Sequence, residues 1–453
     1  MRGTTEEAES ERPINAEPTK AFFVEFLIRD IPLEQAVLDL VDNCIDGARR
    51  LGANGSFEGR WIKIRFDKDR FSITDNCGGF DRANARDYAF RFGRPAGAPK
   101  VGHSIGQFGV GMKRALFKFG RHFIVRSATA NEKWAIDVDV DRWEEENGAW
   151  HFPWSVYPEK GEHPDNATPG TEIIVDRLRD EVGGRFGTEN FQTLVIGLIT
   201  SKHREFIAGN LEISINGKRL NATSLFLLFS AELQPGVTTM SFPEKGKATV
   251  SVRIQVGAGE SVPTAAGWYV ICNGRIILEA DRRRNTGWGL VEENATRVVI
   301  PTFHNQFARF RGITTFDCDD SARLPWNTTK TDVDTDNIIW QQTFQKMREM
   351  MRSTIDFLNQ LDDDIDEFTP ERSGLLARVR NATPMRAERL STPMPFKAPA
   401  RGSVAAMGPK TVKIQYSRPV VDVEFLQDAL GVDSARAVGG KTFDLVLQRQ
   451  RSE

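Results

Sequence analysis

Residues 105–113, Ile-Gly-Gln-Phe-Gly-Val-Gly-Met-Lys, constrain the fold of this chain more than any other segment. They place three glycines in one turn, and a helix-like run over residues 112–119 follows at once. Glycine lets the backbone approach a ligand closely, and the first turn of a helix presents unpaired N–H groups to an anion. Taken alone, the segment is weak evidence, because a tight loop that begins a helix has the same pattern, so its neighbours must decide.

A second feature is an amphipathic helix expected from residue 32 to about residue 50. Its apolar residues recur at helical spacing and form one stripe. Polar residues three or four positions apart form a row opposite this stripe: Asp39, Asn43, Asp46 and Arg50. Carboxylate and amide oxygens in such a row suit a hydrated Mg²⁺ and an oriented water. The alternative interpretation is an ordinary solvated helix face.

A third feature is a β-hairpin whose second strand ends in an acid. Strands are expected at residues 61–66 and 71–75, and Asp75 is followed by Asn-Cys-Gly-Gly. A carboxylate at the end of a buried strand needs donors, because an unpaired buried charge is costly. The exocyclic amino group of a purine is one such donor. The alternative is that Asp75 merely caps the following turn.

Taken together, these segments resemble the ATP-binding domain of the GHKL superfamily, which includes gyrase, the ninety-kilodalton heat-shock chaperone, sensor histidine kinases, MutL and the MORC ATPases. The family's N-box, E-x-x-x-N, corresponds to residues 39–43, its D-x-G-x-G box to residues 75–79, and its G-x-x-G-x-G box to residues 106–111. Residues 169–175 are similar to its late Gly-Thr strand. The resemblance implies an α+β chain that begins with the Bergerat ATP-binding sandwich.

The resemblance also implies a role for each matching residue. Asp39 would be the catalytic base, and Asn43 would coordinate a Mg²⁺ that bridges the phosphates of ATP. Asp75 would accept a hydrogen bond from the adenine amino group, with Gly79 giving room. The other residues expected in the nucleotide site are Asp46, Gln107, Gly109, Val110, Gly111, Met112, Lys113 and Thr171. Residues 91–104 would form a lid over the nucleotide.

Two residues depart from the family's pattern. Asp39 stands where most hydrolysing members carry glutamate, and its shorter side chain predicts slow or switch-like hydrolysis. Cys77 replaces the first glycine of the second box, which indicates that the backbone there does not need a positive φ.

The second half of the chain resembles the family at lower specificity. Residues 267–277 are typical of a strand, an Asn-Gly turn and a strand, and are similar to the S5-like transducer domain of MutL, gyrase and MORC. In that domain a lysine or arginine reaches back to the γ-phosphate. Lys330 is the first candidate, and Lys113 is the second. The alternative for Lys330 is an ordinary surface lysine.

Composition restricts the classes of function. The net charge of −2 gives no basic field that would favour nucleic acid. Four scattered cysteines without a C-x-x-C pair argue against zinc and against a disulfide framework. Without a membrane-spanning apolar run or a signal-peptide core, a cytoplasmic protein with no membrane partner is expected.

The expected organisation has six parts. They are a disordered tail at 1–18, the ATP-binding domain at 19–180, a transducer-like domain at 181–333, a helix at 334–365, a basic linker at 366–410 and a small α/β element at 411–453. This layout is nearest to MORC and predicts an ATP-gated homodimeric clamp or switch. It would act on DNA or on a protein effector in a bacterial defence-type system. The alternative is an ATP-sensing scaffold or chaperone-like module with negligible turnover.

Overall fold

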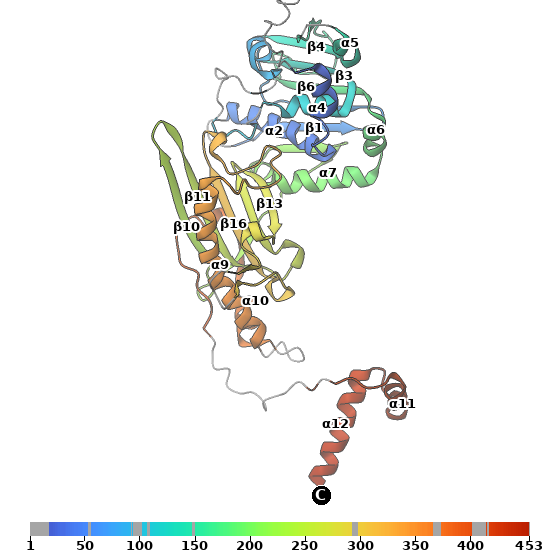
Figure 1. Ribbon diagram of the computed structural model, residues 1–453, viewed down its shortest axis with the longest axis vertical. Helices are drawn as coiled ribbons and strands as arrows, with labels where there is room; N and C mark the ends of the chain where they lie inside the picture. Colours follow the sequence, from blue (N-terminus) through green and yellow to red (C-terminus); the bar gives the residue numbers. More distant parts are fainter. Residues whose placement is uncertain are drawn as a thin grey trace, which may run out of the picture. The chain divides into compact units, whose positions relative to one another are not determined.

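The computed structural model describes residues 18–52, 56–91, 93, 102–106, 109–146, 150–291, 298–365, 373–400, 414 and 416–452, and only the backbone of Val291, Val298 and Val299. The chain divides into two compact units, Met1–Arg401 and Gly402–Glu453. The first unit holds two large sheets, each with its own helices (Figure 1). We call the parts built on these sheets the first and the second domain.

The first domain is built on a sheet whose eight described strands follow the order β5-β4-β3-β6-β2-β1-β7-β8. Its strands are β1 (Trp61–Phe66), β2 (Phe71–Asp75), β3 (Gly120–Ala128), β4 (Lys133–Asp139), β5 (Trp154–Ser155), β6 (Gly170–Leu178), β7 (Glu212–Ile215) and β8 (Lys218–Arg219). Strand β1 pairs antiparallel with β2 and parallel with β7. The first domain therefore extends to Arg219 rather than ending at residue 180, because β7 returns to a strand that precedes it by about 150 residues.

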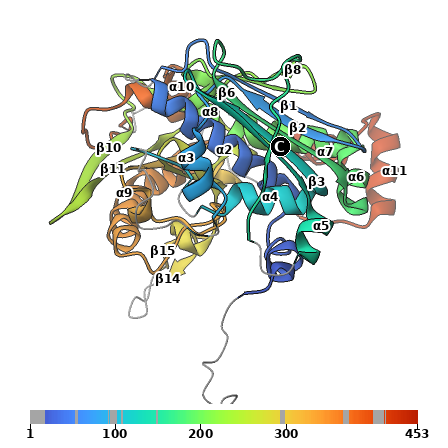
Figure 2. The ribbon, with the colours of Figure 1, turned by 90° about the horizontal axis from the view of Figure 1, so that it is seen from above.

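Helices α2 (Leu33–Leu51) and α4 (Gly111–Phe119) contact each other and lie along one face of this sheet (Figures 1 and 2). They confirm the helices predicted at 32–50 and 112–119. The remaining helical segments of the domain are η1 (Phe22–Phe26), α3 (Arg82–Asn84), η2 (Ala85–Ala89), α5 (Val140–Glu145), α6 (Asp180–Phe186), α7 (Glu189–Lys202) and α8 (Arg204–Ala208).

The second domain is built on a sheet with the strand order β10-β11-β16-β12-β13. Strands β12 and β13 form the predicted hairpin, and Asn273 and Gly274 both have the positive φ that an Asn-Gly turn requires. Helix α9 packs on β11 and β16 through its buried residues Trp340, Met347 and Met351. The strands are β10 (Gly236–Glu244), β11 (Lys247–Ala258), β12 (Gly267–Cys272), β13 (Arg275–Asp281) and β16 (Phe310–Asp317), and α9 covers Ile338–Asp364.

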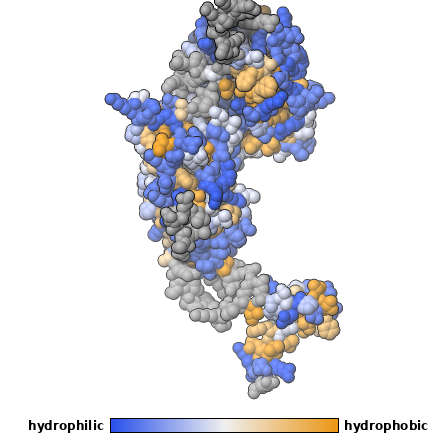
Figure 3. Space-filling view, viewed as in Figure 1, coloured by the Kyte–Doolittle hydropathy of each residue, from blue (hydrophilic) through white to orange (hydrophobic). Residues whose placement is uncertain are grey.

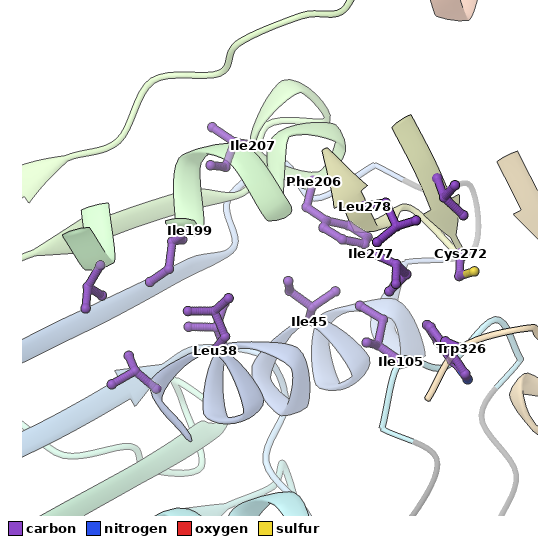
Figure 4. Packing of buried hydrophobic residues seen from close by; sticks show 14 of the residues in the cluster. Leu38, Ile45, Ile105, Ile199, Phe206, Ile207, Cys272, Ile277, Leu278 and Trp326 are labelled. Carbon is purple, nitrogen blue, oxygen red and sulfur yellow. The ribbon is translucent and has the colours of Figure 1, made fainter. Parts of the chain in front are cut away.

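Helix α2 of the first domain also contacts the second domain, and most of its residues are buried. Figure 4 shows Leu38 and Ile45 of α2 pointing toward Ile199 of α7 and Phe206 of α8, with Ile277 of β13 beside them. Asp39 and Asp46 are buried as well, so the interpretation of a solvated helix face is wrong for these two residues, whereas Asn43 and Arg50 are exposed. A polar row in such a place must be satisfied by protein groups or by a ligand.

Part of the expected basic linker is folded. Helix α10 (Gly374–Arg380) buries Leu375, Leu376 and Val379, and β17 (Thr383–Arg386) pairs with β9 (Phe226–Phe229). The linker prediction is therefore wrong for residues 373–400. The Arg and Pro content of this segment predicted a flexible linker, but its scattered apolar residues are buried and fix it in place.

Smaller elements are β14 (Leu290–Val291), β15 (Val298–Ile300), η3 (Pro263–Ala265), η4 (Arg284–Thr286), η5 (Asn305–Phe307), η6 (Ser321–Arg323) and η8 (Ala387–Arg389).

The described residues of the C-terminal unit form helices α11 (Val420–Leu430) and α12 (Ala435–Ser452) and no strand. The α/β prediction for residues 411–453 is therefore wrong. Short β-branched runs resemble strands when they are read alone, but here they lie on helices. The unit carries exposed apolar residues such as Val421, Phe425 and Val446 (Figure 3). No helix in the described part of the chain combines the length and the apolar character that crossing a membrane requires.

Candidate active site

A cavity of about 270 Å³ lies where α2, the end of β2, the start of α4 and the loop 324–333 meet. Every predicted site residue that the structure describes lines it: Asp39, Asn43, Asp46, Asp75, Gly79, Gly109, Val110, Gly111, Met112, Lys113, Thr171 and Lys330. Gln107 and most of the expected lid lie outside the described residues. Five segments that are far apart in the sequence, including β6 with Thr171, thus contribute to one concave site.

Asp75 is a buried acceptor at one end of this cavity. Its Oδ1 accepts hydrogen bonds from the backbone N–H groups of Cys77, at 2.7 Å, and of Thr171, at 3.3 Å. Burial raises the pKa of Asp75 to about 6 despite these two bonds. A carboxylate in such a place gains most from a further N–H donor, because burial penalises its charged form.

The backbone around Asp75 is packed closely. Gly79 has a φ of +60°, and a Cβ at this position would lie 2.2 Å from the carbonyl oxygen of Ala128. Only glycine fits there. Cys77 is outside the positive-φ region, which confirms the prediction made for the departure at this position.

The residues of the polar row of α2 differ in their environments. Asn43 is exposed in the cavity. Asp39 is buried, accepts a hydrogen bond from Gln35 Nε2 at 3.2 Å, and lies with Oδ1 3.6 Å from Lys330 Nζ. Burial raises the pKa of Asp39, and the nearby Lys330 opposes this effect.

Asp46 points its carboxylate at the backbone of the glycine-rich segment. Its two oxygens accept from the N–H groups of Ile105, at 2.8 Å, and Gly106, at 2.7 Å. Burial raises its pKa against these bonds. Asp46 therefore fixes the start of the glycine-rich turn.

Helix α4 begins at Gly111, directly against Asp39. A Cβ at Gly111 would lie 3.1 Å from Asp39 Oδ2, so glycine allows the helix to start close to α2. Val110 is the N-cap, and it provides no side-chain hydrogen bond to the first turn. The first N–H groups of α4 thus lie at the cavity without a side-chain cap, as an anion site requires.

The two candidate lysines have different surroundings. Lys113 is buried, and its Nζ donates to the carbonyl oxygens of Ala89, at 2.8 Å, and Arg91, at 2.5 Å. Burial lowers the pKa of Lys113 to about 7. Lys330 is also buried, so the interpretation of a surface lysine is wrong. Its Nζ donates to Asp42 Oδ2 at 2.7 Å.

Asp42 was not singled out as a site residue by the sequence motifs. Its side chain is fully buried, and Oδ1 accepts from His203 Nε2 at 2.7 Å and from Arg275 Nε at 3.1 Å. Burial alone would raise its pKa, but Lys330 and Arg275 outweigh burial and hold the pKa below its usual range. The sequence does contain a signal for Asp42. This acid lies on the same helix face as Leu38 and Ile45, and an acid on an apolar face indicates a buried cation as its partner.

Comparison with known proteins identifies the family of the segment that forms most of this cavity. Residues 31–162 match the family model of the histidine kinase-, DNA gyrase B- and HSP90-like ATPases. No curated protein matches the sequence. The matched range includes Asp39, Asn43, Asp75 and the start of α4, whereas Thr171 and Lys330 lie beyond it. The first domain of this protein is therefore an ATPase domain of the GHKL superfamily.

Proposed function

We propose that this protein binds ATP in the cavity between α2 and α4, hydrolyses it slowly, and uses the bound γ-phosphate to couple the two domains. The observation that carries the proposal is Lys330. This lysine belongs to the loop after the second sheet, yet its amine reaches the acids of the N-box helix within the ATPase domain.

The polar groups of the cavity suit the three parts of ATP. Asp75, with an acceptor buried at one end, supports recognition of the adenine amino group. The start of α4, without a side-chain cap, supports binding of the phosphates. Thr171 lies beside Asp75 and adds a hydroxyl group on the adenine side.

Asn43 is the residue that fits Mg²⁺. It is exposed and lines the cavity, and hard oxygen donors such as its amide oxygen are the ligands that Mg²⁺ prefers together with substrate phosphates. A Mg²⁺ held there with the phosphates supplies neutralisation of their negative charge.

Asp39 is the residue we assign as the general base. Burial raises its pKa, which makes the carboxylate a better proton acceptor. Its side chain is shorter than that of glutamate, so the attacking water must approach α2 closely. This supports a slow reaction.

A second candidate function is an ATP-sensing scaffold with negligible turnover. The contacts of Asp39 Oδ1 with Gln35 and Lys330 favour it, because both groups stabilise the charged carboxylate and make it a weaker base. In this version ATP changes the conformation of the protein and is released without hydrolysis.

We further propose that ATP binding closes a homodimer that acts on a protein effector or on DNA. The exposed Phe22 and Phe26 of η1 support a contact of this N-terminal segment with a second subunit. The net charge of −2 provides no general attraction to DNA, so a DNA contact would need a local surface.

Steady-state ATP hydrolysis tests the proposal. Asp39→Asn should reduce turnover by about 10²–10⁴-fold, the usual contribution of a general base. Glu34→Gln is the matched control, because Glu34 lies on the same helix but pairs with Arg185 outside the cavity. A wild-type rate in Asp39→Asn contradicts the assignment of the base. ATP binding without turnover in the wild type supports the scaffold, and a rate that rises with added DNA supports DNA as the partner.

A further inference from the structure

The carboxylate of Asp42 lies behind the cavity rather than in it. Asp42 is absent from the cavity lining, whereas Asp39 and Lys330 both belong to it. Lys330 Nζ nevertheless lies closer to Asp42, at 2.7 Å, than to Asp39, at 3.6 Å. The amine is therefore held toward Asp42, on the side of the cavity that faces away from its interior.

The charges around Asp42 balance while Lys330 stays there. Burial lowers the pKa of His203 to about 4, so this imidazole is neutral at pH 7 and donates through Nε2. Its Nδ1 has no hydrogen-bond partner among the described residues, in agreement with the neutral form. Two acids, Asp39 and Asp42, thus face two cations, Lys330 and Arg275.

Asp42 keeps partners if Lys330 leaves. Arg275 and His203 hold Oδ1, whereas Lys330 holds Oδ2. Departure of the amine therefore removes one charged hydrogen bond and leaves a paired carboxylate, which is far less costly than an isolated buried charge. This makes the Lys330–Asp42 bond one that a competing anion can replace.

The backbone at Lys330 is held by the turn around it. Lys330 has a φ of +55°, and its N–H donates to the carbonyl oxygen of Asn327 at 3.0 Å. The Asn327 side chain accepts from the N–H groups of Thr331 and Asp332, which closes the turn. A move of the amine toward the cavity thus requires rotation of the side chain and no opening of the loop.

We propose that Asp42 is a positioning residue that holds the Lys330 amine off the phosphate site until a γ-phosphate competes for it. The inference rests on the proposed binding of ATP in this cavity. Discrimination between ATP and ADP would then depend on the difference between two ion pairs, Lys330 with Asp42 and Lys330 with the terminal phosphate. Because Arg275 and Lys330 both belong to the second domain, the exchange also changes how this domain holds α2.

The test is calorimetric titration with a non-hydrolysable ATP analogue and with ADP, both with Mg²⁺. Asp42→Asn preserves the size of the side chain and removes its charge. It should bind the analogue about tenfold more tightly or better, the fold-change expected when a competing charged hydrogen bond is weakened, and should bind ADP as the wild type does. Lys330→Ala should lose affinity for the analogue. The double variant that carries both Asp42→Asn and Lys330→Ala should bind the analogue as Lys330→Ala does.

Two outcomes overturn the inference while the proposed function stands. One is a wild type that binds both nucleotides while Asp42→Asn leaves the ratio of the two affinities unchanged. The other is an effect of Asp42→Asn that persists in the Lys330→Ala background, because Asp42 would then not act through Lys330. A wild type that binds neither nucleotide overturns the proposed function and the inference with it.

A second variant serves if Asp42→Asn does not fold. Asp42→Asn with Arg275→Gln removes one charge of each sign, so Asp39 and Lys330 remain as a balanced pair. This variant should bind the analogue more tightly than the wild type does and bind ADP as the wild type does, which is the result expected for Asp42→Asn alone. Asp69→Asn, an exposed acid of the β1–β2 turn, is the control and should leave both affinities unchanged.

Discussion

Asp75 leads to a prediction in which stability and nucleotide binding change in opposite directions. Burial raises its pKa from 3.8 to about 6 in the folded protein. Between these two pH values the native state binds more protons than the unfolded chain, so this residue lowers stability as the pH rises. The whole difference corresponds to roughly 3 kcal/mol, and about half of it, roughly 1.4 kcal/mol, falls between pH 5 and pH 7.5.

Asp75→Asn removes this titration but keeps the side-chain oxygen that accepts from Cys77 and Thr171. Denaturant unfolding of the ligand-free protein should therefore show that the variant gains about 1.4 kcal/mol on the wild type between pH 5 and pH 7.5. The same variant should bind ATP about tenfold more weakly or worse, because an acceptor for the adenine amino group is lost.

The result that refutes this reasoning is a stability difference between variant and wild type that does not change with pH. Asp75 would then not be a buried carboxyl with a raised pKa. Unchanged ATP affinity in the variant would instead remove Asp75 from the nucleotide site. Asp69→Asn, the same substitution at an exposed acid of the β1–β2 turn, is the control.

Three further predictions concern the metal, the coupling and the packing. Asn43→Ala should weaken binding of Mg²⁺-ATP more than binding of metal-free ATP in calorimetry, and equal losses would contradict its role as a ligand. Lys330→Ala should still bind nucleotide but lose the dimer closure that light scattering detects with a non-hydrolysable analogue; a variant that closes normally would favour Lys113 as the γ-phosphate ligand. Gly79→Ala should lower the denaturation midpoint by the equivalent of about 1–3 kcal/mol or more, because the new Cβ would meet the backbone of Ala128, and an unchanged midpoint would contradict this packing.

Elements with a strong local signal could be predicted from the sequence. The helix expected at 32–50 is α2, and the strands expected at 61–66 and 71–75 are β1 and β2. Their periodicity and turn residues depend on nearby positions only. The motifs also predicted residues that line one cavity, because Asp39 lies within α2, Asp75 ends β2, and Gly111 begins α4 beside them.

The network around Asp42 could not be predicted in this way. Its partners His203, Arg275 and Lys330 lie at least 161 positions away, and no local pattern relates them to α2. The same reason explains why the sequence predicts an end of the first domain at residue 180, which is too early: β7 pairs with β1 only in the folded chain.

The predictions for the linker and for the C-terminal element are wrong for a different reason. Both rest on composition, and composition does not show which apolar residues become buried. Leu375 and Val379 anchor α10 despite the arginines around them. In the C-terminal unit, residues that favour strands lie on α11 and α12.

The most direct test of the central claim is photo-crosslinking of the wild type with 8-azido-ATP, followed by mapping of the labelled peptides. The account predicts label on peptides that contain residues 75–80 or 170–175, with loss of the label when unmodified ATP competes. Label confined to other parts of the chain, or label that ATP does not displace, would contradict the claim that this cavity binds ATP.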